Sequence, residues 1–590
     1  YVDVVLSPDP NVFGHSNALA GLKKNGVLVM QSDAATSEEV WSAIPRRYRK
    51  IIVDNDIRIF YLDAFRIARD EATDPELQLR MQGIAFQGAF FATSPLLEKH
   101  GLSEDQLLDA IRDQLQHKFG GKGARVVEDN MRVVRRGFEE IVEVTDKHLD
   151  EDKLKGENTL PVPVMVKRLP QSESASSDIH RFWAQTGSMY ASGLGESIPA
   201  DPFTSMSLMP AVTSHFRDMT GIRFEHPEFI PENCTACGDC YTVCPDTAIP
   251  GLVNETGQVL DTVVNRMKKA GRPTNHLPRA VRQMDMKLKK LLAAAGETES
   301  VSKIIGQAIE ETIAGYDGGS AEIEQLTAEF KDFREELGTF QFALSRPYFT
   351  NPEKKQAGNG GLLSITVDPY TCKGCMECVE VCNDDALVPV TQTKESVADL
   401  RKNWDFWLDL PNTPEKYIRV DNLEEGIGAL ETILLNKDAY LPFASGDGSC
   451  IGCGEKTAMH LFVATVESLM QPRVKKHVAY LDELIAKLKK YVQMKLVDEI
   501  DIGDAKEMQA VLSDNSGAEL TLASIAESVE RTSEAEPIDR QWLQYVTDLV
   551  AKLQDLRWRY EAGTTGTGRS NMGILNATGC TSVWGSTYPF

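Results

Sequence analysis

The sequence lacks any run of about 18 or more apolar residues, the length at which a segment becomes a candidate membrane-spanning helix. The first residues, YVDVVLSP, contain neither the basic region nor the apolar core segment of a secretory leader. We therefore expect a soluble, cytoplasmic protein that does not associate with a membrane.

Basic residues are scarce relative to acidic ones. The 63 lysines and arginines face 87 aspartates and glutamates, which gives a formal net charge of −24. A nucleic-acid partner is a polyanion that calls for a net basic surface, so the composition argues against one. The chain of 590 residues exceeds the size of a single core, and about three or four domains are expected. It starts at Tyr1 and ends at Phe590 in a Gly/Ser/Thr-rich loop, which predicts an internal piece of a longer protein.

Cysteine is also sparse, yet eight of the eleven cysteines fall into two runs of identical spacing, C-x2-C-x2-C-x3-C. The first run comprises Cys234, Cys237, Cys240 and Cys244, and the second comprises Cys372, Cys375, Cys378 and Cys382. In a cytosolic chain such cysteines indicate metal binding or catalysis rather than disulfides. The spacing is that of bacterial ferredoxins, in which three close cysteines bind one [4Fe-4S] cluster and the fourth binds the neighbouring cluster.

The predicted ligand sets therefore cross between the runs. One set is Cys234, Cys237, Cys240 and Cys382, and the other is Cys372, Cys375, Cys378 and Cys244. A zinc site or a disulfide framework is the alternative, but zinc sites commonly use paired C-x2-C knuckles instead of a triple run. A proline, Pro245, follows the first run, whereas Asn383 stands at the equivalent position after the second run. The residue at this position shapes a turn and is not a ligand.

The N-terminal part, residues 1–148, alternates short apolar runs with helical patterns. The predicted strands are Val2–Leu6, Gly26–Met30 and Ile51–Asp54, and the predicted helices are Asn17–Lys24, Ser37–Ile44 and Leu62–Arg69. This alternation predicts an α/β domain with a mainly parallel sheet.

The remaining chain divides by composition into four parts. Residues 149–225 are rich in Pro, Ser and Met and predict a wrapping linker, with a partly disordered segment as the alternative. Residues 226–395 contain both cysteine runs and a helical insertion at 255–345. Residues 396–440 form a bridge, and residues 441–590 carry a second helical insertion at 470–560, which predicts an antiparallel arm.

The first insertion has opposed charges. Arg266 to Lys290 holds nine lysines and arginines against one aspartate, whereas Glu310 to Glu336 is mainly acidic. Two interpretations stay open: the helices neutralise each other, or the basic segment is a landing site for an acidic electron carrier.

Three cysteines lie outside the runs. Cys450 and Cys453 stand in FASGDGSCIGCGEK, and Cys580 stands in NATGCTSVWG. Three thiols are one short of the four that a [4Fe-4S] cluster normally takes. Free thiols and a C-x2-C redox pair are the alternatives to a third cluster.

These last two segments closely resemble the thiamine diphosphate domain of the pyruvate:ferredoxin (flavodoxin) oxidoreductase family. The segments SPDPNVFGHSN and NWDFWLDLP are similar to its first domain and to its bridge. The resemblance implies a multidomain α/β chain with a gamma-type α/β domain, a two-[4Fe-4S] ferredoxin-like α+β domain and the start of a thiamine diphosphate-binding α/β domain, with helical insertions.

The resemblance also implies roles for individual residues. Cys450, Cys453 and Cys580 become ligands of a third [4Fe-4S] cluster close to thiamine diphosphate, with the fourth ligand later in the chain. Glu455, and the backbone from Thr578 to Cys580, become contacts of that cofactor. Asp447 lies in a GDG segment, but the family's magnesium motif lies further downstream, so we expect a turn residue here and the Mg²⁺ site past Phe590.

The implied activity is oxidative decarboxylation of a 2-oxoacid, pyruvate by default, with coenzyme A to acyl-CoA and CO₂. Electrons pass through three [4Fe-4S] clusters to ferredoxin or flavodoxin, in a homodimer, and no catalytic residue is assigned. The alternatives are the same chemistry on 2-oxoglutarate or another 2-oxoacid, and an iron-sulfur electron-transfer module without catalysis. An electron-transfer module without catalysis would give no role to Cys450, Cys453 and Cys580.

Overall fold

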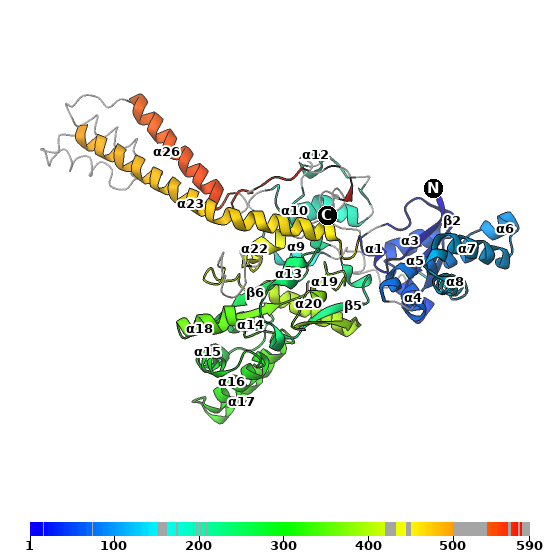
Figure 1. Ribbon diagram of the computed structural model, residues 1–590, viewed down its shortest axis with the longest axis horizontal. Helices are drawn as coiled ribbons and strands as arrows, with labels where there is room; N and C mark the ends of the chain where they lie inside the picture. Colours follow the sequence, from blue (N-terminus) through cyan, green and yellow to red (C-terminus); the bar gives the residue numbers. More distant parts are fainter. Residues whose placement is uncertain are drawn as a thin grey trace.

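The computed structural model describes residues 1–149, 162–418, 432–443, 450–499 and 540–580, apart from short gaps. The gaps are residues 16, 73–74, 173–174, 193, 196–197, 201, 207–208, 217, 564–567, 571, 576 and 578. Figure 1 shows an N-terminal α/β body at one end, a central body, and a long two-helix arm that projects from it.

A four-stranded sheet organises the N-terminal body. Its strands are β1 (Val2–Ser7), β2 (Leu22–Gln31), β3 (Arg58–Leu62) and β4 (Val142–Val144), in the order β1-β2-β3-β4. The first three are parallel and β4 is antiparallel to β3, which confirms the predicted mixed α/β fold with a parallel sheet. Side chains of β2 alternate between two cores: Leu28 and Met30 pack on one face, and Val27 and Val29 on the other. The strand reads as a continuous apolar run because helices cover both faces.

The helices of this body cover the sheet and form its outer layer. They are α1 (Val12–His15), α2 (Ser37–Ala43), α3 (Arg46–Asp54), α4 (Ala64–Glu71), α5 (Pro75–Thr93), α6 (Leu96–His100), α7 (Glu104–Phe119), η1 (Gly120–Lys122) and α8 (Ala124–Glu139). Helices α2 and α4 lie close to the predicted ranges 37–44 and 62–69.

Two local predictions were wrong. The predicted strand Ile51–Asp54 is the end of α3, and the strand lies at β3 instead. Tyr48 and Ile52 are four positions apart and both buried, which is helical spacing. The predicted strand began at Ile51 and so left out Tyr48, the residue that shows this spacing. The predicted helix Asn17–Lys24 is a turn that leads into β2.

Short helices connect the N-terminal and central bodies. They are α9 (Val164–Arg168), α10 (Ile179–Phe182), η2 (Trp183–Gly187), α11 (Ser188–Ala191), α12 (Pro202–Met206), η4 (Thr213–Phe216) and η5 (Met219–Gly221). Met165, Val166 and Ile179 are buried in the same core as the insertion helices. Arg168 adds an ion pair to Asp409 at 2.6 Å, so this segment packs on the central body.

The two cysteine runs lie in two similar strand-helix-strand units. The first unit is β5 (Glu225–Phe229), η6 (Pro231–Asn233), α13 (Asp239–Val243) and β6 (Gly251–Asn254), and the second is β7 (Leu362–Ile365), α19 (Glu377–Glu380) and β8 (Leu387–Thr391). The units exchange strands, because β5 pairs with β8 and β6 pairs with β7, both antiparallel. The first strand of one unit therefore lies beside the last strand of the other.

The insertion between these units is a helical bundle, which is placed below the strand units in Figure 1. Its helices are α14 (Thr256–Lys269), α15 (Leu277–Ala294), α16 (Val301–Ala314) and α17 (Ser320–Leu337), followed by η7 (Arg346–Thr350) and α18 (Asn351–Lys355). Arg266 pairs with Glu336 at 2.7 Å and Arg272 with Glu335 at 3.2 Å. These pairs favour the interpretation in which the two segments neutralise each other.

The bridge and the arm complete the described chain. Their helices are α20 (Lys394–Asp409), α22 (Lys437–Tyr440), η9 (Leu441–Phe443), α23 (Gly454–Glu499) and α26 (Arg540–Glu561). Helices α23 and α26 run antiparallel, since Asp482 meets Arg557 while Tyr491 meets Trp542. No helix in the described parts of the chain has the length and apolar character that crossing a membrane requires.

Candidate metal centre

Each cysteine run folds into the same tight backbone path. Three positions at equal offsets from the first cysteine of each run have positive φ. The matched pairs are Ala236 (66°) and Gly374 (68°), Gly238 (88°) and Met376 (63°), and Thr247 (50°) and Asp385 (51°). A residue with a side chain loses about 1–2 kcal/mol in this region. Four of these six residues are not glycine and carry that cost. Contacts with the surrounding structure must therefore hold these loops in this conformation.

Backbone N–H groups also point at sulfur in the same way in both runs. The N–H of Ala248 donates to Sγ of Cys244 at 3.2 Å, and the N–H of Ala386 donates to Sγ of Cys382 at 3.2 Å. Such donors stabilise a thiolate and tune the potential of a cluster bound to it.

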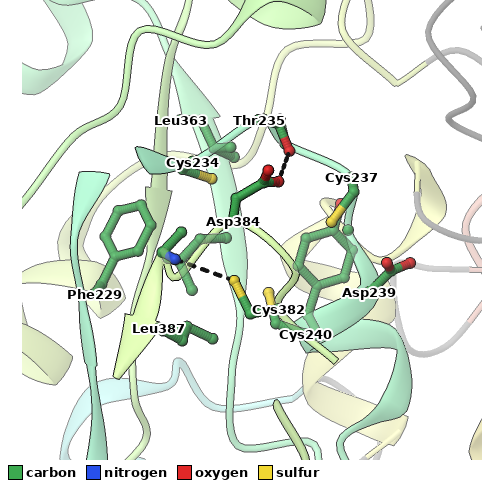
Figure 2. Close-up of a pocket in the computed structure, with 15 residues that line it drawn as sticks. Phe229, Cys234, Thr235, Cys237, Asp239, Cys240, Leu363, Cys382, Asp384 and Leu387 are labelled. Carbon is green, nitrogen blue, oxygen red and sulfur yellow. Dashed lines mark hydrogen bonds between the residues drawn. The ribbon is translucent and has the colours of Figure 1, made fainter. Parts of the chain in front are cut away.

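The exchanged strands bring the fourth cysteine of each run to the other run. A first cavity is lined by Cys234, Cys237, Cys240 and Cys382, with a volume of about 410 Å³ including its open mouth. Figure 2 shows these four side chains around one space, together with Asp384, which accepts a hydrogen bond from Thr235 at 2.7 Å. Phe229, Leu363 and Leu387 are among the apolar residues of the wall.

A second cavity is lined by Cys244, Cys372, Cys375 and Cys378. Its volume, measured in the same way, is about 310 Å³. The structure thus gathers the eight cysteines into the two crossed sets, and their role as ligands stays a prediction.

Each cavity offers four thiols, as many as a [4Fe-4S] cluster takes. Within the described residues, no three His, Cys, Asp or Glu side chains converge closely enough to hold one metal ion. The cysteines of a [4Fe-4S] cluster bind different irons, so their sulfur atoms stand further apart than ligands of one ion do. The eight cysteines form no disulfides.

Burial opposes the use of most of these cysteines as free redox thiols. It raises the pKa of Cys234 to about 12, with nearby Cys237 and Cys382 adding to the shift, and it raises the pKa of Cys375 to about 11. The pKa values of Cys240 and Cys244 rise well above the usual range for the same reason. A thiol that stays protonated is a poor nucleophile, whereas a metal displaces the proton and supplies compensating charge.

The segment before α23 contacts the second cavity. Gly452 has φ of 64°, and a Cβ added there would lie 3.4 Å from Cβ of Cys375 and 3.4 Å from Oε1 of Glu377. The hydroxyl of Thr457 donates to the carbonyl of Val243 at 3.1 Å. Cys450 and Cys453, which flank Gly452, are exposed and half-buried, respectively.

The other predicted site residues are not brought into a pocket by the described structure. Glu455 is exposed in the first turn of α23, and Cys580 is exposed near the end of the described chain. Thr578 and Asp447 lie outside the described residues. The third cluster and the cofactor contacts therefore stay predictions.

Sequence reasoning missed a buried charge cluster behind the second cavity. Asp246 accepts from Nζ of Lys456 at 2.5 Å and lies 3.4 Å from Nζ of Lys373. Lys373 directly follows Cys372 and Asp246 lies two positions after Cys244, which was a usable signal. Lys456 lies 210 positions from Asp246, and no local pattern connects them.

Two cavities that each gather four cysteines on exchanged strands match the arrangement expected of a two-cluster ferredoxin, while the clusters themselves stay a prediction. The comparison with known proteins is more particular. Residues 1–140 match the family model described as Pyruvate ferredoxin/flavodoxin oxidoreductase, which confirms the resemblance seen in the sequence.

Curated relatives extend this similarity over much of the chain at low identity. The pyruvate dehydrogenase [NADP(+)] of Cryptosporidium parvum is 22% identical over 467 residues, which covers 77% of this chain and 19% of that protein. The putative pyruvate-flavodoxin oxidoreductase of Synechocystis sp. is 21% identical over 434 residues, 72% of this chain and 26% of that protein. The pyruvate:ferredoxin oxidoreductase of Moorella thermoacetica is 23% identical over 249 residues, 42% of this chain and 19% of that protein. The chain thus spans about a fifth to a quarter of the length of these relatives.

Proposed function

We propose that this chain works in an enzyme that oxidatively decarboxylates a 2-oxoacid, pyruvate by default. The 2-oxoacid and coenzyme A become acyl-CoA, CO₂ and a proton, and two electrons leave one at a time. The chain holds three [4Fe-4S] clusters that conduct these electrons to ferredoxin or flavodoxin. The main support is that two cavities collect the eight cysteines of the two runs in crossed sets. The first 140 residues of the same chain match this oxidoreductase family.

The proposed division of the chain follows from the same reading. Residues 1–148 are the gamma-type α/β domain, residues 226–395 the two-cluster ferredoxin-like domain, and residues 441–590 the start of the thiamine diphosphate-binding domain. Thiamine diphosphate, held with Mg²⁺, supplies the carbanion chemistry at the 2-oxo carbon. Glu455, Thr578 and the backbone at Cys580 are the proposed contacts of this chain to the cofactor.

The described contacts support an order in which electrons pass between the proposed clusters. Cys450, Cys453 and Cys580 bind the third cluster, and the Gly452 backbone contacts the segment that contains Cys375 in the second cavity. This contact supports a route from the third cluster to the second cavity, then to the first. Cys237 is exposed at the first cavity, which supports an exit to the external carrier there.

The relatives differ in the electron acceptor that their names give. Two relatives are named pyruvate dehydrogenase [NADP(+)], and others are named for flavodoxin or ferredoxin. Ferredoxin or flavodoxin is the proposed partner, with NADP⁺ as the comparison.

The test is anaerobic reduction of a viologen dye by the intact protein, supplied with thiamine diphosphate and Mg²⁺. Pyruvate and 2-oxoglutarate are offered in turn, each with and without coenzyme A. Reduction that depends on coenzyme A and on one acid supports the proposal and names the substrate. No reduction by either acid, from protein with full iron content and thiamine, would reject both substrates and favour the non-catalytic electron-transfer module.

A further inference from the structure

The wall of the second cavity contains buried charges of both signs. Asp246 and Lys373 line the cavity, and Lys456 approaches Asp246 from the first turn of α23. The exposed fractions are 7% for Asp246, 5% for Lys373 and 3% for Lys456. The two ammonium groups lie within 3.4 Å of the same carboxylate oxygen. The three groups together carry a formal excess of one positive charge.

A further cation lies behind the same cysteine run. The buried guanidinium of Arg223 donates from Nη1 to the carbonyl of Cys372 at 2.6 Å and to the carbonyl of Pro369 at 3.0 Å. Two other carboxylates are close: Glu377 lines the cavity and is half-buried, and Asp368 pairs with His215 at 2.6 Å. Among the described residues, Arg223, Lys373 and Lys456 therefore balance Asp246, Glu377 and Asp368 around this cavity.

The first cavity has the opposite character. Among the described residues that line it, the charged ones are Asp239 and Asp384, and none is a lysine or arginine. Both aspartates are exposed, so solvent and salt screen part of their effect. The two cavities are similar in backbone but differ in the sign of the surrounding charge.

Charge of this kind acts on the reduction potential. Reduction adds one electron to a cluster, breaks no bond and moves no proton, so the cluster becomes more negative. A buried cation stabilises the reduced form and raises the potential, and an anion lowers it. The buried position matters because the effective dielectric there is lower than in water.

We propose that the Lys373–Asp246–Lys456 cluster makes the second cavity's iron-sulfur cluster easier to reduce than the one in the first cavity. The inference rests on the proposed function only in that both cavities hold clusters. Lys456 follows Cys453 by three residues, so its charge lies between the segment of the third cluster and the second cavity. The second cavity then holds the first electron that arrives until the second electron or the carrier follows.

The test is a redox titration with dithionite in the intact protein, followed by electron paramagnetic resonance. It needs neither substrate nor thiamine diphosphate. A signal that disappears in Cys375→Ala belongs to the second cavity and is the one to follow. In the unaltered protein, this signal appears at a higher potential than that of the first cavity.

Two variants should shift this signal in opposite directions. Lys456→Met removes a cation and leaves Asp246 paired with Lys373, so the ratio of reduced to oxidised cluster should fall on the order of tenfold at a fixed potential. For a one-electron couple this is about 59 mV. Asp246→Asn removes the anion and should raise the ratio. Lys456→Arg keeps the charge and should restore the original potential.

Lys487→Met is the matched control. Lys487 pairs with Glu483 on the exposed surface of the same helix, and it lies roughly 45 Å along α23 from Lys456. This variant should leave the potential unchanged. Equal potentials in all variants, or shifts of the same sign in Lys456→Met and Asp246→Asn, would overturn the inference. Protein without bound iron at either cavity would reject the proposed function instead.

Discussion

The ammonium group of Lys456 lies 2.5 Å from the carboxylate of Asp246, although 210 positions separate them in the chain. Both side chains are buried, and removal of one partner from a buried ion pair is costly because the other charge is left uncompensated. Here Lys373 gives Asp246 a second partner. The contact fixes the first turn of α23 to the end of the first cysteine run, so Gly452 is held against Cys375.

Replacement of Gly452 by valine should slow electron entry into the second cavity. A Cβ at this position meets Cys375 and Glu377 at 3.4 Å, and a β-branched residue with φ of 64° costs about 1–2 kcal/mol locally. The segment must move away, so substrate-driven reduction of the second cluster should become several-fold slower in anaerobic stopped-flow measurements. Gly454→Ala is the control, because a Cβ there meets nothing within 4 Å. Equal rates in both variants would contradict the contact.

Lys437→Met should destabilise the bridge. The ammonium group of Lys437 donates to the carbonyls of Trp407, Leu408 and Leu410, each at 2.8 Å, and so satisfies the last turn of α20. It also lies 4.6 Å from the ring centre of Trp407.

The loss of these bonds should cost about 3 kcal/mol. Urea unfolding followed by tryptophan fluorescence should show it, since Trp404 and Trp407 stack at 4.8 Å. Lys402→Met, at an exposed position with a weak pair to Asp399, should leave the urea midpoint unchanged. Matching midpoints for the two variants would contradict this role for Lys437.

Local sequence patterns predicted the N-terminal sheet because its strands are short apolar runs bounded by polar residues. They failed at Ile51–Asp54, where the same run of β-branched residues continues the buried face that Tyr48 begins. The choice between strand and helix depended on residues before the run. It also depended on which side chains pack against it, and a short stretch of sequence does not contain that information.

The cysteine spacing predicted which thiols should group together, because ligand spacing is set by local chain geometry and cluster chemistry. The same reasoning did not predict the charges behind them. The burial of Lys456 depends on α23 packing across α13, as the bond from Thr457 to Val243 shows. Charge placement of this kind depends on tertiary contacts, which the spacing of a motif does not encode.

Stability should fall between pH 6.5 and about 4 through His460. Burial lowers the pKa of His460 from 6.5 to about 4, and the positive charge of Lys456 adds to the shift. Between these values the unfolded chain binds a proton that the folded chain does not, so stability decreases as pH falls and is unaffected by this group above pH 6.5. The difference of about 2.5 pKa units corresponds to about 3 kcal/mol.

His460→Gln should remove this part of the pH dependence. The measurement is the midpoint of thermal unfolding, taken anaerobically at several pH values and compared between variant and unaltered protein. His477→Gln is the control, because His477 lies further along α23, where its ring packs against Tyr560. The same pH dependence in all three proteins would show that His460 does not contribute.

The crossed ligand sets make a prediction that separates them from two independent sites. Cys382 lies in the second run but lines the first cavity with Cys234, so Cys382→Ala should alter the same cluster signal as Cys234→Ala. Cys372→Ala should alter the other signal, because Cys372 lines the second cavity. Iron content should fall by up to about four atoms in each variant. Asn383→Ala, at the exposed neighbouring position, should retain all iron. If Cys382→Ala matched Cys372→Ala instead, each run would bind its own cluster, and the exchange of strands between the units would have no role in ligand binding.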